Sequence, residues 1–361
     1  MGFAFKIWYI LIIYSRSGIF FSVIIRQIKS NVLSYKGSNL EFMILTPITP
    51  ENFDITVLKP LSRLPFLKQE SLLRTFRQIK LPQYDAILSL GNGYLTYSAF
   101  NNHPVVLYNY GVSPSFSGPD DLRYWSIDKL QYRLGASLWR KRIKSMDMHL
   151  IRDKVDRVCS ISEFARKRFY EYYGIDSIVI NPPVETKLYR YKEQKGYYLL
   201  VDRMVPEKRI NLAIDAFKKL SDKTLVIEGN GPMEKKLKKS AEGFKNIKFL
   251  GRVDTDSLRK LYSEAIALIS LPTKQDWSMI MTEALASGKP CICVNRGAYN
   301  EIITEDKTGT LVETNVNGII NGVEKMTIEA AKGMKEACLK QARKYDEKNF
   351  YKQWDKIFKE L

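Results

Sequence analysis

The second half of the chain alternates short apolar runs with amphipathic segments, and this alternation restricts the folds open to it. The apolar runs are rich in strand-forming residues and begin at positions 197, 224, 247, 266, 290 and 309. The intervening segments carry apolar residues at helical spacing, and several end in glycine, as helices commonly do. Repetition of strand and helix is typical of a parallel sheet covered on both faces. The sequence therefore predicts a Rossmann-like domain here.

The first half alternates less regularly. Its strand-like runs begin at positions 6, 41, 84, 104 and 157, and a basic, aromatic segment, 121–154, precedes the last of them. We interpret this half as a second Rossmann-like domain with an insertion.

A linker is predicted at 180–196, because the Pro182–Pro183 pair favours an extended path and the following residues are charged. The predicted domains are residues 1–183 and 184–345. The amphipathic segment 346–361 is expected to form a helix that packs back on the first domain.

The composition favours acidic partners. The chain has 57 Lys and Arg against 39 Asp and Glu, for a net charge of +18. The cations are scattered and no recognition motif appears, so we expect no nucleic acid partner. We expect association with an anionic membrane surface instead, by peripheral contact.

Histidine and cysteine usage argues against a metal site. Only two histidines occur, and the four cysteines are dispersed except for Cys291 and Cys293, which point to opposite faces of a strand-like run. The apolar N-terminal stretch is interrupted by Lys6 and Arg16, so it is too short to span a membrane. We expect a cytoplasmic protein and leave peripheral attachment to the cytoplasmic face of the membrane open.

Ligands of open α/β sheets bind beyond the carboxyl ends of the strands, which directs attention to the loops there. Arg203 and Lys208 follow the strand at 197 and flank a proline turn, a pair suited to a diphosphate. A solvated basic turn is the alternative.

Gly229 opens a Gly-Asn-Gly-Pro turn that permits close approach of a ligand, although a tight turn explains it equally. The third glycine of a dinucleotide fingerprint and its acidic partner are absent, which disfavours a dehydrogenase.

The stretch 273–289, TKQDWSMIMTEALASGK, contains the third loop. A helix beginning near Ser278 would present unpaired amides to a phosphate or a sugar hydroxyl. Glu283 could then accept hydrogen bonds from a ribose, and Gln275 could meet the transferred group. The alternative is that both are ordinary surface residues.

These loops occur together and in order, and with them the chain resembles the retaining GT-B glycosyltransferases of family 4. The matching pieces are CSISEFARKRFYEYYG with VINPPVE, VDRMVPEKRINLAIDAF, IEGNGP, IKFLGRV, QDWSMIMTEALASGKPCICVNRGAYNEII and KTGTLV. The resemblance is good from residue 156 onward and holds only in outline before it. Within the family the chain looks most like archaeal and bacterial mannosyltransferases that act on lipid-linked or polysaccharide glycans. The resemblance implies an α/β GT-B fold, with two Rossmann-like domains whose parallel sheets face a central cleft.

The resemblance also implies roles for individual residues. The catalytic set would be Arg203, Lys208 and Gln275, with the two cations on the donor diphosphate. Glu283 would bind the ribose, and Gly297 and Glu301 match a turn that supports the site. The donor-binding set would be Gly18, Gly229, Arg252, Val253, Asp276, Ser278, Met279, Ile280 and Glu283.

Three departures from the family pattern stand out. Gln275 replaces the first of two glutamates, so this position carries no charge. A histidine is common near Tyr110, where this chain has none, and the glycine turn after the first strand is reduced to Ser17-Gly18-Ile19.

The resulting prediction is an enzyme that moves a hexose, with a preference for mannose from GDP-mannose, from a nucleotide sugar to a glycan or polyprenyl-linked acceptor. The reaction would retain configuration and need no metal cofactor. A degenerate GT-B protein that binds nucleotide sugar or glycan without turnover remains the alternative. Contacts to the acceptor or membrane are predicted for Arg123, Trp125, Trp139 and Arg140, and a solvated pair of helices with core tryptophans is the alternative for this segment.

Overall fold

The computed structural model describes residues 9–14, 42–47, 53–58, 86–90, 104–110, 145 and 148–361. The chain divides into two compact units. Unit 1 comprises Met1–Ile180 with Tyr351–Leu361, and unit 2 comprises Asn181–Phe350. The predicted boundary after residue 183 falls three residues from the observed one, and each unit is described by itself.

Unit 2 is built on a six-stranded sheet in the order β10-β9-β8-β11-β12-β13, and every pair of neighbours is parallel. All six strands predicted from the alternation are present. The inner strands of such a sheet are buried on both faces, which explains why they read as continuous apolar runs, whereas the edge strand β10 exposes Lys248 and Leu250. Their bounds are β8 Tyr197–Val201, β9 Thr224–Glu228, β10 Ile247–Gly251, β11 Leu268–Ser270, β12 Cys291–Val294 and β13 Gly309–Val312.

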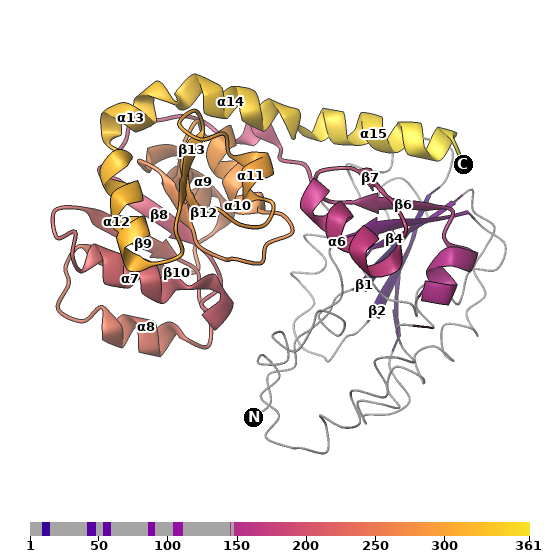
Figure 1. The fold of residues 1–361 in the computed structure, drawn as a ribbon, viewed down its shortest axis with the longest axis horizontal. Helices are drawn as coiled ribbons and strands as arrows, with labels where there is room; N and C mark the ends of the chain where they lie inside the picture. The colour runs from indigo at the N-terminus through magenta and orange to yellow at the C-terminus, as the bar shows by residue number, and fades with distance from the viewer. Residues whose placement is uncertain are drawn as a thin grey trace, which may run out of the picture. The chain divides into compact units, whose positions relative to one another are not determined.

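Helices cover both faces of this sheet (Figure 1). On one face α7 contacts α8 and α12, and on the other α10 contacts α9 and α14. Several begin at capping side chains, as in α9, where Asp254 accepts from the amides of Asp256 and Ser257 at 3.0 and 2.9 Å. The bounds are α7 Ile210–Phe217, α8 Glu234–Ser240, α9 Thr255–Glu264, α10 Met279–Ala286, α11 Tyr299–Ile302, α12 Val316–Lys325, α13 Ile328–Gly333 and α14 Lys335–Lys344, with short 3₁₀ turns η2 Thr186–Leu188 and η3 Pro206–Lys208.

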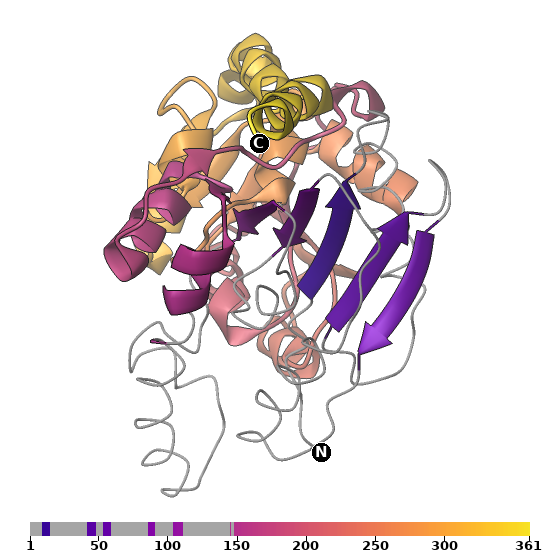
Figure 2. The same cartoon turned by 90° about the vertical axis from the view of Figure 1, so that its right-hand side faces the viewer.

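Unit 1 contains a seven-stranded sheet in the order β3-β2-β1-β4-β5-β6-β7. Its strands are β1 Tyr9–Tyr14, β2 Phe42–Pro47, β3 Phe53–Leu58, β4 Ala86–Leu90, β5 Val105–Asn109, β6 Arg157–Ser160 and β7 Ile178–Val179. Neighbours from β4 to β7 are parallel, as are β1 and β2, whereas β2 with β3 and β1 with β4 are antiparallel. Figure 2 shows β3 running opposite to β2.

The parallel order predicted for this half therefore does not extend to every strand. The connection 48–52 between β2 and β3 is short enough for a hairpin but too short for a parallel crossover, which fixes their antiparallel pairing. β3 and β7 were also not predicted, and the two-residue length of β7 leaves almost no periodic signal in the sequence.

Helix α15, Glu347–Lys359, begins in unit 2, and its residues from Tyr351 onward belong to unit 1. Its Trp354 is 1% exposed and meets the Tyr108 ring of β5 edge-on, with 5.1 Å between ring centroids. The Tyr108 hydroxyl donates to the Ile180 carbonyl at 2.6 Å. The C-terminal helix thus contributes a large aromatic side chain to the core of unit 1.

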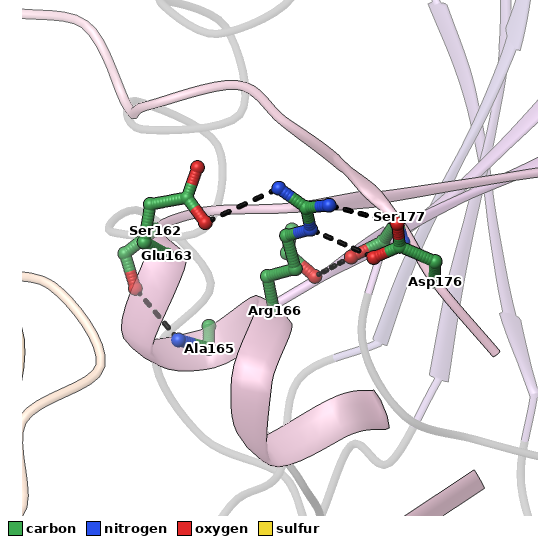
Figure 3. Close-up of polar contacts among 7 residues, drawn as sticks. Ser162, Glu163, Ala165, Arg166, Asp176 and Ser177 are labelled. Atoms are coloured by element: carbon green, nitrogen blue, oxygen red, sulfur yellow. Dashed lines mark hydrogen bonds and ion pairs between the residues drawn. The ribbon is translucent and has the colours of Figure 1, made fainter. Parts of the chain in front are cut away.

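Helix α6, Glu163–Tyr173, contains much of the motif CSISEFARKRFYEYYG, and its serines and charges have structural roles. Ser162 caps the helix by accepting from the Ala165 amide at 2.9 Å. Arg166 donates two 2.7 Å hydrogen bonds to Asp176 and a 3.3 Å bond to Glu163 (Figure 3). The two hydrogen bonds from Arg166, the hydrogen bond from the Ser177 amide and the positive charge of Arg166 lower the pKa of Asp176 to about 2.

Lys289 is buried at the end of the α10 segment with 0% exposure. Its ammonium donates to the Lys192 carbonyl at 2.6 Å and lies 4.1 Å from the centre of the Tyr191 ring. Burial lowers the pKa of Lys289 to about 8, although Glu193 opposes the shift. The fold therefore holds a lysine charge in its interior through a carbonyl dipole and an aromatic face.

This burial predicts a pH-dependent difference between the protein and Lys289→Met. Between about pH 8 and the ordinary lysine pKa of about 10.4, the unfolded chain keeps a proton that the folded lysine has released. Stability of the wild type relative to the variant should therefore rise with pH in this window and be constant below it. The measurement is the difference in melting temperature between the two proteins from pH 7 to 10.

Lys335→Met serves as the control, because Lys335 lies on the same Tyr191 ring at 4.5 Å but with its side chain 37% exposed. A Lys289→Met difference that does not change with pH would contradict the prediction.

Candidate functional site

The first part of the site follows β8, where Asp202 and Lys208 form an ion pair. The Lys208 Nζ lies 3.0 Å from Asp202 Oδ1, and the two side chains are only 23% and 12% exposed. Burial raises the pKa of Asp202, and Lys208 opposes this shift. The 3₁₀ turn Pro206–Lys208 returns the chain toward the strand end, which brings these two residues together.

The loop after β11 reaches the same lysine. Lys208 Nζ donates to Gln275 Oε1 at 3.5 Å, and Gln275 Nε2 donates to the Trp277 carbonyl at 2.5 Å. Trp277 is buried and packs edge-on against Tyr345, with 5.1 Å between centroids. The structure thus brings two of the predicted catalytic residues, Lys208 and Gln275, into contact. The packing of Trp277 anchors the loop that carries Gln275.

Two predicted turns support these loops through close backbone contact. A Cβ on Gly229, whose φ is +120°, would lie 2.1 Å from the Asp202 carbonyl oxygen. A Cβ on Gly297 would lie 2.6 Å from the Gln275 carbonyl oxygen, which also accepts from the Ala298 amide at 3.0 Å. Glycine is therefore required at both places by neighbouring backbone, and a role of Gly229 toward a donor stays a prediction.

Helix α10 begins immediately after this loop, at the position expected from the sequence. Ser278 precedes it with extended backbone and is 3% exposed, and Met279 and Ile280 form its first turn with partly exposed side chains. The first amides of a helix have no partner within it and carry the positive end of its dipole. This end of the helix can therefore receive an anionic group. Asp276 lies in the same loop and is partly exposed.

Glu283, on the same helix, takes part in a separate set of contacts. Tyr262 of α9 donates to Glu283 Oε2 at 2.9 Å. Burial, together with the charge of Glu283, raises the pKa of Tyr262 and of Tyr189. Arg259 lies 6.0 Å from the centre of the Tyr189 ring. The carboxylate is therefore oriented by tyrosines that the sequence did not single out.

At the end of β9, Glu228 organises the turn that follows β10. Its Oε1 accepts from the Val253 amide at 3.2 Å, and its side chain is buried. Burial raises the pKa of Glu228, and Arg252 lowers it. The Val253 amide is thus used inside the protein, while Arg252 is exposed.

Arg203 is exposed, and within the described part of the chain its guanidinium has no ion-pair partner closer than 4.0 Å. It stays accessible beside the Asp202 and Lys208 pair, as a residue that meets a ligand would be. Glu228, Tyr189 and Tyr262 were missed because their contacts are with other elements of the fold, and Asp202 was missed because the turn that returns Lys208 to it was not predicted. The one local signal was the acid of Asp202 directly before Arg203.

The remaining predicted residues lie outside the described part of the chain. They are Gly18, Arg123, Trp125, Trp139 and Arg140. In unit 1 the described residues include a groove lined by Arg152, Arg157 and Arg166 together with Asp156 and Asp176. The groove carries both positive and negative side chains, and the charge of Arg166 is already balanced by its ion pair with Asp176.

Neither a metal centre nor a membrane span is found where the structure can be described. Among the described residues no group of three or more His, Cys, Asp or Glu side chains is placed to hold a metal ion. No helix of the described part of the chain combines the length and apolarity needed to cross a bilayer.

Comparison with known families places the site in a recognised domain. Residues 186–345 match the model of the family described as "Glycosyl transferases group 1". This segment contains every described residue that was predicted to bind the donor.

Relatives match over similar regions. An uncharacterized glycosyltransferase of Methanocaldococcus jannaschii is 30% identical over 176 residues, covering 47% of this chain and 44% of the relative. A GDP-mannose-dependent alpha-(1-6)-phosphatidylinositol monomannoside mannosyltransferase of Mycobacterium tuberculosis is 27% identical over 211 residues, covering 50% of this chain and 54% of the relative. The chain thus matches about half the length of these curated relatives.

Solved structures extend the likeness to both units. Sucrose-phosphate synthase from Thermosynechococcus elongatus superposes with a TM-score of 0.69 at 14% identity, covering 94% of this chain and 92% of that one. The Anabaena protein HepE in complex with UDP and glucose gives a TM-score of 0.64 at 16% identity, covering 89% and 86%. At these identities the likeness shows the fold, which is GT-B.

Proposed function

We propose that the protein is a retaining glycosyltransferase that uses a nucleotide sugar as donor, because residues 186–345 match the model of the group 1 glycosyltransferases. The observation that carries the proposal is Lys208, held between Asp202 and Gln275 within the matched segment. A partly buried ammonium at the carboxyl end of a parallel sheet suits the diphosphate of such a donor.

In the proposed reaction the bond between the sugar anomeric carbon and the diphosphate oxygen breaks, and the acceptor hydroxyl oxygen bonds to the same carbon from the face that the diphosphate leaves. The hydroxyl proton passes to the departing diphosphate oxygen. Arg203, Lys208 and the first amides of α10 stabilise the negative charge that develops on the departing nucleoside diphosphate. Glu283 binds the ribose, oriented by Tyr262. The two cations supply the charge neutralisation, so the proposal includes no metal cofactor.

The proposed sugar is a hexose, with GDP-mannose as the first donor to test. Its support is the family resemblance and the mannosyltransferase of M. tuberculosis, named as GDP-mannose-dependent. The proposed acceptor is a glycan or polyprenyl-linked glycan. The net charge of +18 supports peripheral contact with an anionic membrane surface, on the cytoplasmic face.

The test is thermal stabilisation by UDP, GDP, ADP and their sugar conjugates. One nucleotide should raise the melting temperature of the wild type and have much less effect on Arg203→Ala, because the variant lacks a cation for the diphosphate. Arg343→Ala, an exposed arginine of α14, is the matched control and should respond as the wild type does.

The outcomes separate the readings. No stabilisation by any nucleotide at millimolar concentration would overturn the proposal. Stabilisation with no sugar transfer to any acceptor would favour a protein that binds nucleotide sugar without turnover.

A further inference from the structure

Asp202 is the carboxylate in contact with the proposed diphosphate-binding lysine, and the fold holds it rigidly. Its Oδ1 accepts from the Arg203 amide at 2.9 Å in addition to its ion pair with Lys208 at 3.0 Å. Its own amide donates to the Glu228 carbonyl at 3.1 Å. Gly229 packs directly on its carbonyl oxygen. With backbone and side chain both fixed, the flexible lysine must adapt to the carboxylate.

The second neighbour of Lys208 is neutral. Gln275 offers its amide oxygen to the ammonium at 3.5 Å and uses its amide nitrogen on the Trp277 carbonyl. Within this set of contacts the single carboxylate balances the charge of the lysine, and the amide adds none. A carboxylate at position 275 as well would add one negative charge beside an anionic ligand, which costs binding energy.

We propose that Asp202 is a positioning residue that holds the Lys208 ammonium for the donor diphosphate, and that Gln275 is uncharged because Asp202 already supplies the counter-charge. The inference rests on the proposed function for the identity of the ligand. It follows that a carboxylate at either position 202 or position 275 should support nucleotide binding, whereas carboxylates at both positions should weaken it.

The test is a double-mutant cycle on the affinity for UDP, GDP or ADP, whichever binds the wild type most tightly by calorimetry. Asp202→Asn should weaken binding about 10-fold, because the lysine loses its anchor, and Gln275→Glu should weaken it about 10-fold by repulsion. The double variant, with asparagine at 202 and glutamate at 275, should bind within about threefold of the wild type. A merely structural role of Asp202 would not be rescued in this way.

Other results of the cycle would overturn the proposal. Additive losses in the double variant would show that the two positions do not share one charge. Tighter binding by Asp202→Asn would show that Asp202 competes with the diphosphate for Lys208. Asp222→Asn is the matched control, because Asp222 also pairs with a lysine, Lys223 at 3.0 Å, but is 70% exposed. It should leave affinity unchanged, and melting temperatures of all variants check that they fold.

A nucleotide-free measurement separates this inference from the proposed function. The acetylation of Lys208 by acetic anhydride, read by mass spectrometry, reports how firmly the amine is held. Asp202→Asn should increase the rate several-fold, and adding Gln275→Glu should reverse the increase. An unchanged rate in Asp202→Asn overturns the inference, whereas the expected pattern in a protein that binds no nucleotide means that the proposed function has failed.

Discussion

Replacing Lys208 by methionine is expected to reduce sugar transfer by a factor of about 100 to 1000, the cost of removing one preorganised donor from a site of developing negative charge. Methionine keeps most of the side-chain length and removes the ammonium. Asp202 then loses its ion-pair partner, and Gln275 loses its donor. The measurement is turnover of the donor identified by thermal stabilisation, with saturating acceptor.

A control variant distinguishes a loss of turnover caused by the missing ammonium from one caused by unfolding. Lys218→Met removes a lysine of the same unit that pairs with Asp215 at 2.9 Å, outside the proposed donor site, and should leave turnover within about twofold. Turnover of Lys208→Met near the wild-type level would rule out the assigned role of the ammonium.

Gly229→Ala should lower the melting temperature of the protein by roughly 6 to 12 °C. The φ of +120° is unfavourable for alanine, and the new methyl group would sit 2.1 Å from the Asp202 carbonyl oxygen. Strain and overpacking together cost about 3 kcal/mol, and each kcal/mol shifts the melting temperature of a unit of this size by about 2 to 4 °C. Thermal unfolding followed by circular dichroism measures the shift.

Gly243→Ala serves as the control that measures the cost of a positive φ alone, without the steric contact. Gly243 also has a positive φ, +86°, but a Cβ there would meet nothing within 4 Å. Its substitution should cost only about 1 kcal/mol of conformational strain. Equal effects of the two substitutions would show that the contact with Asp202 is unimportant.

The sequence predicted the strands well because burial on two faces leaves a strong local signature. All six strands of unit 2 were identified, and five of the seven in unit 1. Of the two strands not identified, β7 is two residues long and leaves almost no periodic signal. β3 does carry the alternation of a strand, FDITVL, but its antiparallel pairing departs from the regular strand and helix alternation used for the prediction.

The candidate site was predicted in part. The loops after β8 and β11 were identified as one site because parallel strands end at the same edge of the sheet. The contact of Lys208 with Gln275 is the structural counterpart of that expectation. The partners Asp202 and Tyr262 were not predicted. Tyr262 belongs to another helix than Glu283, and the position of Asp202 directly before Arg203 does not by itself show that the turn brings Lys208 back to it.

By itself, the sequence determined the α/β class, the order of strands and helices in unit 2, and the loops that carry cations and polar groups. These properties are local, because periodicity, capping and turn residues act within a few positions of one another. Only the tertiary structure decided that Asp202 balances the charge of Lys208, that Gly229 is required by the Asp202 carbonyl, and that Lys289 is buried. The Asp202–Lys208 pair depends on how one turn folds back on its strand, and the other two depend on distances between segments far apart in the chain. A charge or a methyl group acts on whatever lies within a few ångströms of it.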